Sequence, residues 1–193
     1  MVLFLTFFKQ VFFNTNIQNM ILQNDGIKLR ALEPEDIDLI YKWENNTEIW
    51  NVSNTLVPFS RFVISQYIEN SARDIYENKQ LRLVIESLEK QDAVGAIDIF
   101  DFDPFHRRAG IGILIADEKD RQQGYASAAL DSMIEFGFND LGLKQFYCNI
   151  SVDNQDSLNL FRGRGFMDCG MKRCWTKVGT KWVDEIMLQL IND

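Results

Sequence analysis

The sequence predicts an α/β fold in which helices pack on both faces of a mixed sheet, and three observations support this prediction. Short apolar segments that read as strands alternate with segments of helical periodicity. The clearest helix follows Gly124, where Leu130, Met133, Ile134 and Gly137 fall on one face. No internal repeat, low-complexity tract or interdomain linker interrupts the pattern, so the 193 residues are expected to share one core.

Seven segments read as strands, because each is apolar and bounded by polar residues. They are residues 27–31, 81–86, 93–100, 107–116, 145–152, 166–176 and 181–190. A polar turn at 87–92 joins the second and third strands, and the last two strands are expected to pair across 178–180.

Four helices are expected between these strands. Pro34 suits the first turn of the first helix, which also carries acidic residues near its positive end. Ser60 can cap the second helix. The apolar side of that helix is expected to carry Ile64, Tyr67, Ile68 and Ile75. The third helix is the periodic one after Gly124, and the fourth covers 154–163.

The turn before the third helix has the features of an anion-binding site. The apolar strand 111–116 leads to Arg-Gln-Gln-Gly-Tyr-Ala at 121–126, where the helix starts. The first N–H groups of a helix have no intrahelical partner and lie at its positive end. Gly124 lets a ligand approach the backbone closely. The pattern is neither a P-loop nor a Gly-x-Gly-x-x-Gly turn, and taken alone an ordinary strand-to-helix turn would explain it equally well.

A second segment, at 146–166, reads as a strand followed by a short helix and its exit. Together the two segments resemble the GNAT superfamily of acetyl-CoA-dependent N-acetyltransferases. Three residues match the motif that holds the CoA pyrophosphate in that family: Arg121, Gly124 and Ala126. Five match its second motif: Asn154, Ser157, Phe161, Gly165 and Phe166. The resemblance extends from about Ile27 to the C-terminus and looks strongest toward the subgroup of ribosomal-protein and spermidine/diamine N-acetyltransferases.

This resemblance implies a GNAT-like, mostly antiparallel sheet of about seven strands with a central V-shaped splay. It implies acetyl-CoA as cosubstrate, with the strand at 113–115 pairing its backbone with the pantetheine arm. The strand at 145–152 should splay away and leave the cleft. The implied cofactor-binding residues are Ile113, Leu114, Ile115, Arg121, Gln122, Gln123, Gly124, Tyr125, Ala126, Asn154, Ser157 and Phe161.

The implied reaction needs a proton acceptor, because a lysine-like amine with a pKa of about 10.4 is mostly protonated at neutral pH. The chain departs from the family at two positions. Many relatives carry a tyrosine at Phe161 as proton donor to the thiolate, and relatives often carry a glutamate at Gly110. At these two positions, this chain therefore has neither the usual acid nor the usual base of the family.

Asp98 and Tyr147 are the candidate catalytic residues. Asp98 lies between two isoleucines of an apolar strand, where a carboxylate needs a reason. It can be a base or an anchor for a cationic amine, or a buried acid paired with an arginine such as Arg107 or Arg108. Tyr147 can donate a proton if its ring points into the cleft, or it can be a core residue. Asp101 is expected to be a solvated loop acid.

Composition bounds the partners. The net charge of −8 and pI near 4.7 argue against nucleic acid as a principal partner and are compatible with a cationic substrate. The three cysteines form no disulfide framework or metal-ligand spacing, and a single histidine makes a His-based metal site unexpected. A reducing cytoplasm is the simplest setting.

Residues 1–24 are expected to be an apolar N-terminal extension to a single N-acetyltransferase domain at 25–193. The extension lacks the features of a signal peptide and is shorter than the ~20 apolar residues that span a bilayer, so it is not expected to cross a membrane, and a membrane is not a favoured partner. It can be an added strand or helix, a membrane-surface segment or residues upstream of the true start. We favour an appendage that the chemistry does not require.

The sequence thus predicts direct transfer of an acetyl group from acetyl-CoA to a primary amine in a ternary complex, with a polyamine or other small amine favoured. No covalent acyl-enzyme is expected, because no Cys or Ser lies beside a plausible base. The alternatives are a protein N-terminal acetyltransferase and a non-catalytic acyl-CoA-binding regulatory protein. A homodimer is conceivable.

Overall fold

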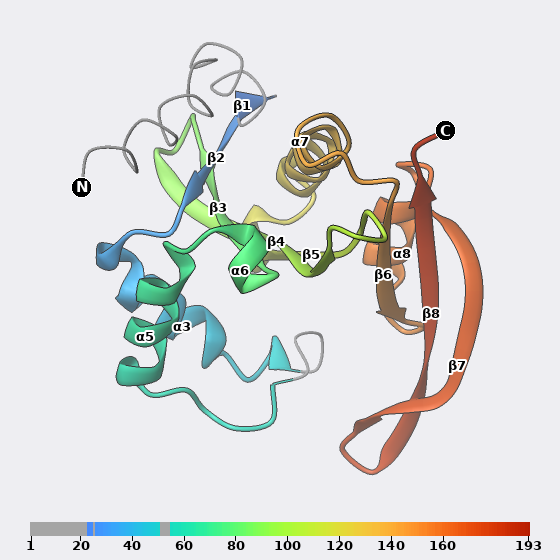
Figure 1. The fold of residues 1–193 in the computed structure, drawn as a ribbon. Coiled ribbons are helices and arrows are strands. Elements are labelled where there is room, and N and C mark those ends of the chain that lie inside the picture. Colours follow the sequence, from blue (N-terminus) through green and yellow to red (C-terminus); the bar gives the residue numbers. More distant parts are fainter. Residues whose placement is uncertain (1–22, 25, 51–54) are drawn as a thin grey trace.

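The computed structural model describes residues 23–24, 26–50 and 55–193, and these build one sheet in the strand order β1-β2-β3-β4-β5-β6-β8-β7 (Figure 1). The strands are β1 Gln23–Asn24, β2 Ile27–Ala31, β3 Leu81–Ser87, β4 Asp92–Asp103, β5 Arg108–Ile115, β6 Gln145–Ser151, β7 Met167–Val178 and β8 Lys181–Ile191. The helices are η1 Pro34–Asp36, α3 Ile37–Glu44, α5 Arg61–Ser71, α6 Ile75–Asn78, η2 Glu118–Asp120, α7 Tyr125–Asn139 and α8 Gln155–Arg162.

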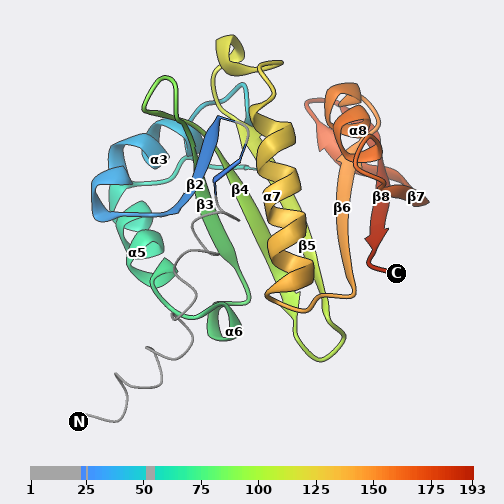
Figure 2. The same ribbon diagram turned by 90° about the horizontal axis from the view of Figure 1, so that it is seen from above.

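The sheet parts at its centre, between β5 and β6. These strands form the one parallel pair of the described sheet, and every other neighbouring pair is antiparallel. Their pairing covers only three positions and ends at Gly110↔Tyr147. Beyond that point β5 continues to Ile115 and β6 to Ser151, but the two strands no longer pair with each other. They therefore diverge (Figure 2). The predicted mixed sheet with a V-shaped splay is confirmed.

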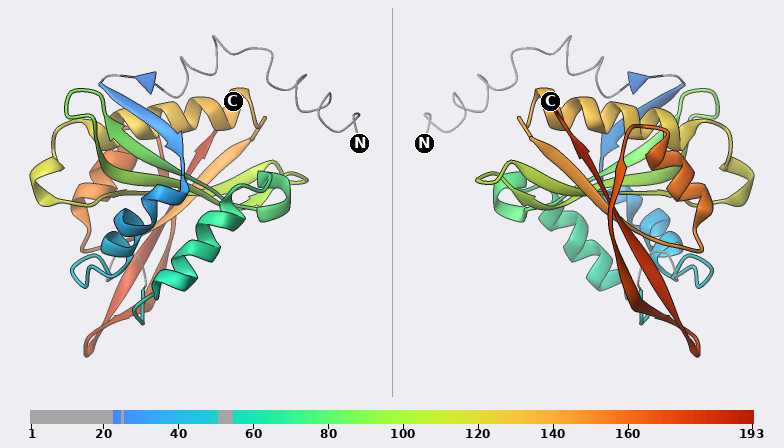
Figure 3. Two further views of the ribbon diagram at one scale, coloured as in Figure 1. Left: turned by 90° about the vertical axis from the view of Figure 1, so that its left-hand side faces the viewer. Right: turned by 90° about the vertical axis from the view of Figure 1, so that its right-hand side faces the viewer.

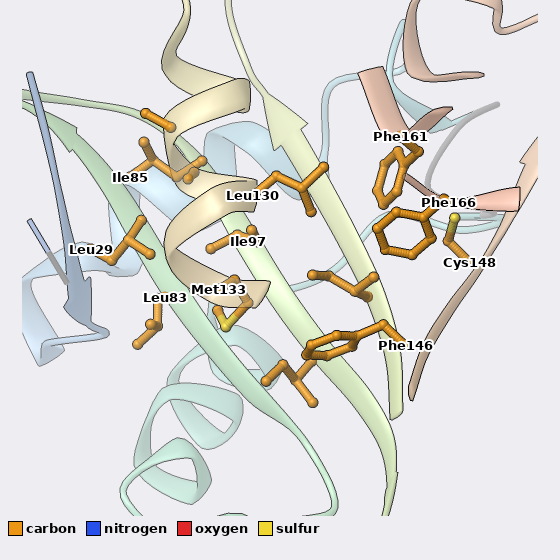
Figure 4. Close-up of a cluster of buried hydrophobic side chains, with 14 of the residues drawn as sticks. Leu29, Leu83, Ile85, Ile97, Leu130, Met133, Phe146, Cys148, Phe161 and Phe166 are labelled. Carbon is orange, nitrogen blue, oxygen red and sulfur yellow. The ribbon is translucent and has the colours of Figure 1, made fainter. Parts of the chain in front are cut away.

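Helices cover both faces of the sheet, as predicted, and Figure 3 shows α7 on one face and α3 with α5 on the other. The larger core cluster lies on the α7 face, where Leu130 and Met133 pack against strand residues such as Ile97 (Figure 4). A smaller cluster lies on the other face, where Ile40 of α3 and Ile64 of α5 belong to the same group of buried side chains. Successive side chains along a strand therefore alternate between the larger and the smaller cluster.

Three boundaries differ from those predicted. The sheet has eight strands, because Gln23 and Asn24 pair as β1 against β2. β4 does not end at residue 100 but continues through a register irregularity to Asp103. The second helix is capped by Ser60 as expected, but it ends at Ser71, and Ile75 opens the separate helix α6.

The predicted N-terminal extension falls almost wholly on residues 1–22, which lie outside the described residues. Among the helices that the structure describes, none is long and apolar enough to cross a membrane.

Candidate active site

The turn before α7 presents free backbone N–H groups to the surface. Gly124 is the N-cap of α7, has φ +86°, and leaves open space where a Cβ would lie. No side chain in the described part of the chain caps this helix end. The first backbone bond of the helix runs from Ala128 N to Gly124 O at 3.0 Å, so the N–H groups of Tyr125, Ala126 and Ser127 precede the intrahelical ladder. This arrangement suits a phosphate group.

The side chains of this turn divide into two groups. Arg121 is about half exposed. Among the described residues its guanidinium pairs only with Glu118, at 3.8 Å on the surface, which leaves it available to an anion. Gln122 and Gln123 are exposed beside it, and Gln122 has φ +59°. The Tyr125 ring instead points inward, where its hydroxyl accepts a hydrogen bond from Ser87 at 3.2 Å. Tyr125 therefore offers a ligand its backbone and uses its side chain to hold the turn.

The backbone edge of β5 faces the gap between β5 and β6. Ala116 N donates to Val94 O at 3.0 Å, so the backbone groups of Ala116 point toward β4. Because backbone groups alternate along an antiparallel strand, those of Ile113 and Ile115 point the other way, into the gap. Their side chains pack on the α7-face core, while that of Leu114 lies on the opposite face. This edge can pair with an extended amide-bearing chain such as pantetheine.

The segment at 154–166 flanks the gap from the β6 side. The Asn154 side chain caps α8 by accepting a hydrogen bond from Ser157 N at 3.2 Å. Phe161 is 3% exposed and packs edge-on against Phe166, with ring centroids 5.0 Å apart (Figure 4). The Phe161 ring is thus part of the core, and it has no hydroxyl to donate.

Asp98 lies on the face of the sheet covered by α3 and α5, in a cluster of three charged side chains. Arg82 donates to both carboxylate oxygens, at 2.6 and 3.2 Å, and its third nitrogen donates to Glu44 at 2.5 Å. Burial raises the pKa of Asp98 above its usual range, although the attraction of Arg82 opposes this. The arginine that pairs with Asp98 is therefore Arg82. Arg107 and Arg108, the partners suggested by the sequence, bind other groups.

Tyr147 lies on the same face, at the last paired position before the strands diverge. Its hydroxyl donates to Asp101 Oδ2 at 2.9 Å. Burial and this hydrogen bond raise the pKa of Tyr147 to about 12. Asp101 has φ +49°, a left-handed conformation that is uncommon outside glycine, at the irregularity near the end of β4. Asp101 is exposed, as the sequence predicted, but it lies within β4 and not in a loop beyond the strand, so its contact with Tyr147 was not predicted.

Phe100 fills the space above Gly110. A Cβ on Gly110 would lie 2.2 Å from Phe100 Cε2, so this position accepts no larger residue without movement of the ring. Phe100 also contacts Tyr147 edge-on, with centroids 6.0 Å apart. The space in which the family resemblance implies a glutamate side chain is therefore occupied by an aromatic ring from the neighbouring strand.

A cavity of about 210 Å³ opens over the charged cluster, between α3, α5 and β3. It is lined by Ile40, Glu44, Phe59, Val63, Ile64, Tyr67 and Arg82. Its walls are mostly apolar, and its charged groups are Glu44 and Arg82, of which Arg82 binds Asp98. Among the described residues, no group of three or more His, Cys, Asp or Glu side chains could hold a metal ion.

The fold and this site together define a GNAT-type N-acetyltransferase: a sheet parted between two parallel strands, with a helix N-terminus beside the gap. Residues 27–167 match the family model described as an acetyltransferase (GNAT) domain. The chain belongs to this family and is an acetyl-CoA-dependent N-acetyltransferase.

Named relatives include two spermidine N(1)-acetyltransferases. That of Vibrio cholerae is 27% identical over 147 residues, covering 76% of this chain and 82% of the relative. That of Escherichia coli K12 is 26% identical over 144 residues, covering 73% of each. The crystal structure of the Vibrio cholerae spermidine N-acetyltransferase in complex with CoA and spermine superposes with a TM-score of 0.78 at 21% identity, covering 86% of this chain and 95% of that one. At this sequence identity, the structural similarity shows a shared fold.

Proposed function

We propose that this protein transfers the acetyl group of acetyl-CoA to a primary amine, with a di- or polyamine as the favoured acceptor. The observation that carries the proposal is the pair of diverging strands, with free helix N–H groups beside the gap and carboxylates on the α3–α5 face. The names of the spermidine acetyltransferase relatives support the acceptor class. The net charge of −8 is compatible with a cationic substrate.

Acetyl-CoA would be held by the two elements that border the gap on the β5 side. The N–H groups at the start of α7, the backbone at Gly124 and the Arg121 side chain would receive the pyrophosphate, with Gln122 and Gln123 beside them. The backbone of Ile113 and Ile115 would pair with the pantetheine arm, beside Leu114. On the β6 side, Asn154, Ser157 and Phe161 would act by positioning α8 along the cosubstrate.

The reaction would be direct attack of the amine on the thioester within a ternary complex. A backbone N–H of the 113–115 segment would stabilise the developing charge on the thioester oxygen. The departing thiolate, with a pKa of about 8.5, can take its proton from solvent.

The attacking amine must lose a proton, and Tyr147 with Asp101 offers a route for it. The proton would pass to the Tyr147 oxygen while the hydroxyl proton of Tyr147 moves to Asp101 Oδ2. Asp101 is exposed and would return the proton to water. Asp98, already held by Arg82, would serve as part of the anchor for a cationic acceptor.

A thiol-release assay with acetyl-CoA tests the proposal, using spermidine, short diamines, monoamines and basic N-terminal peptides as acceptors. Turnover with di- or polyamines above the enzyme-free rate, with acetylated amine detected by mass spectrometry, is the expected result. Turnover confined to peptides would replace the acceptor assignment by protein N-terminal acetylation. Acetyl-CoA binding without thiol release for any acceptor would contradict the catalytic proposal.

Self-association belongs to the same proposal. A structure of the Vibrio cholerae spermidine N-acetyltransferase is described as dodecameric. We expect this chain to form at least a homodimer, which light scattering coupled to gel filtration would measure. A single monomer mass of 22.5 kDa at assay concentrations would contradict this expectation.

A further inference from the structure

We propose that the cavity between α3, α5 and β3 is the acceptor site, that the acceptor reaches the thioester across Gly112, and that Glu44 receives its distal cationic group. This inference rests on the proposed function and specifies the residues that select the acceptor. The ligand class is an alkyl amine that carries a second cationic group at the far end of its chain.

The path from the cavity to the gap follows from the register of β4 and β5. Asp98 lies directly opposite Gly112, and residues directly opposite in an antiparallel pair share a face of the sheet. Gly112 is therefore on the α3–α5 face, beside the charged cluster and immediately before the backbone of Ile113 that faces the gap. An acceptor amine that crosses Gly112 arrives at the proposed position of the thioester.

The space above Gly112 is open, in contrast to that above Gly110. A Cβ built on Gly112 meets only Phe100 Cε1, at an ordinary 3.6 Å, whereas one on Gly110 would meet the same ring at 2.2 Å. The Phe100 ring thus covers Gly110 and leaves Gly112 uncovered. Packing therefore does not require glycine at position 112, whereas an open path for the acceptor does.

The charged cluster at the cavity favours a cation. Two carboxylates, Glu44 and Asp98, share one guanidinium, Arg82, so the three groups carry one net negative charge when both acids are ionised. Asp98 has both oxygens engaged by Arg82, whereas Arg82 donates to one oxygen of Glu44. Glu44 lines the cavity and its side chain is 21% exposed, which places the available carboxylate oxygen within reach of a ligand.

The remaining walls specify what joins the two ends of the acceptor. Ile40, Phe59, Val63 and Ile64 present apolar surface, and Tyr67 adds an aromatic ring that already stacks with Arg82, whose guanidinium carbon lies 5.3 Å from its centroid. A chain of methylene groups gains from burial against such a surface, whereas a polar chain would lose hydration without hydrogen-bond partners. The cavity therefore suits a diamine or polyamine segment with an apolar spacer.

The first test isolates the path. Gly112→Val retains a backbone that any residue can adopt. It is compared with Gly170→Val on β7, where a Cβ would meet no described atom within 4 Å. We expect Gly112→Val to lower kcat/KM for cadaverine by about 100-fold, the effect of a displaced acceptor, while the affinity for acetyl-CoA stays unchanged. Gly170→Val should match the wild type. Retention of wild-type kcat/KM by Gly112→Val would overturn the path.

The second test isolates the charge, using cadaverine and n-pentylamine, which share a five-carbon chain. We expect the wild type to prefer cadaverine and Glu44→Gln to reduce that preference about 10-fold or more, with thermal unfolding as the control for folding. An unchanged preference would overturn the role of Glu44.

If the wild type acetylates no amine, the proposed function fails, but the site is still testable by calorimetry of cadaverine binding in the presence of CoA. Binding that Glu44→Gln weakens would support the site, and the absence of binding would overturn it.

Discussion

The hydroxyl of Tyr147 donates a 2.9 Å hydrogen bond to the carboxylate of Asp101, at the position where β5 and β6 cease to pair. Phe161 and Gly110 supply neither the acid nor the base that the family resemblance implies at these positions. Tyr147 with Asp101 is a tyrosine–carboxylate pair at the mouth of the gap. Its tyrosine keeps its proton at neutral pH, because burial and the hydrogen bond raise its pKa to about 12.

Replacing Asp101 by Asn should remove the proton acceptor while keeping an oxygen that can accept from Tyr147. We expect kcat to fall by about 100-fold or more, within the range of general acid–base catalysis, with little change in the affinity for acetyl-CoA. Tyr147→Phe should cause a loss of similar size, and the double variant should lose little more than either single one. Steady-state kinetics across pH 6–10 would measure this. Wild-type kcat in Asp101→Asn would assign the pair to structure.

Arg121 is expected to act on the pyrophosphate and not on the thioester. Arg121→Ala should lower kcat/KM for acetyl-CoA by roughly 10- to 100-fold, which corresponds to the loss of a charge-assisted hydrogen bond of about 1.5–3 kcal/mol. It should leave kcat/KM for S-acetylpantetheine, which lacks the pyrophosphate, unchanged. An equal loss with both thioesters would show that Arg121 supports the fold of the turn or the reaction centre instead.

The helix turn before α7 and the order of elements could be predicted because their signals are local. Gly124 precedes a periodic apolar face, and the Asn154 cap is a short-range hydrogen bond to Ser157. The partner of Asp98 could not be predicted in this way. It depends on the register of β3 against β4, which places Arg82 opposite Asp98 and not Arg107 or Arg108.

The contact between Asp101 and Tyr147 could not be predicted from the sequence because it depends on a single backbone irregularity. A strand that ends at Phe100 leaves Asp101 in a loop, whereas the observed β4 continues and turns Asp101 toward Tyr147 with φ +49°. One signal in the sequence was available, because Phe100 and Phe102 flank Asp101 as apolar neighbours that a solvated loop does not need. The two rings have different surroundings in the structure: Phe102 belongs to the core on the α7 face, whereas Phe100 packs against Gly110.

Asp36 is expected to couple stability to pH at the start of the first helix. Its carboxylate accepts two hydrogen bonds from Arg30 and one from Glu33 N at 2.9 Å. Burial opposes ionisation, but these bonds outweigh it and lower the pKa of Asp36 below its usual range. Because the folded-state pKa is lowered, the stabilisation is present above the unfolded value of about 3.9 and is lost as pH falls through the lower folded value.

Asp36→Asn should therefore reduce the free energy of unfolding by about 1–3 kcal/mol at pH 7, the cost of an unsatisfied or weakened polar contact. The difference from the wild type should shrink as the pH falls below about 4. Urea unfolding at pH 7 and at a pH below about 4 would measure this. Asp38→Asn, which removes the carboxylate of an exposed ion pair with Arg61, is the matched control. A difference that does not depend on pH would place the effect in packing and not in the charge.

Restoring a glutamate at position 110 should not restore the usual base of the family. The Cβ of any residue there would meet the Phe100 ring at 2.2 Å, so Gly110→Glu should destabilise the protein by about 1–3 kcal/mol through overpacking. Phe100→Ala in the same chain opens the space, and the double variant should then be more stable than the sum of the two single effects. Chemical unfolding of the four proteins in a double-mutant cycle would measure this coupling. Additive effects would mean that the ring moves aside freely, and would remove the steric reason for glycine at this position.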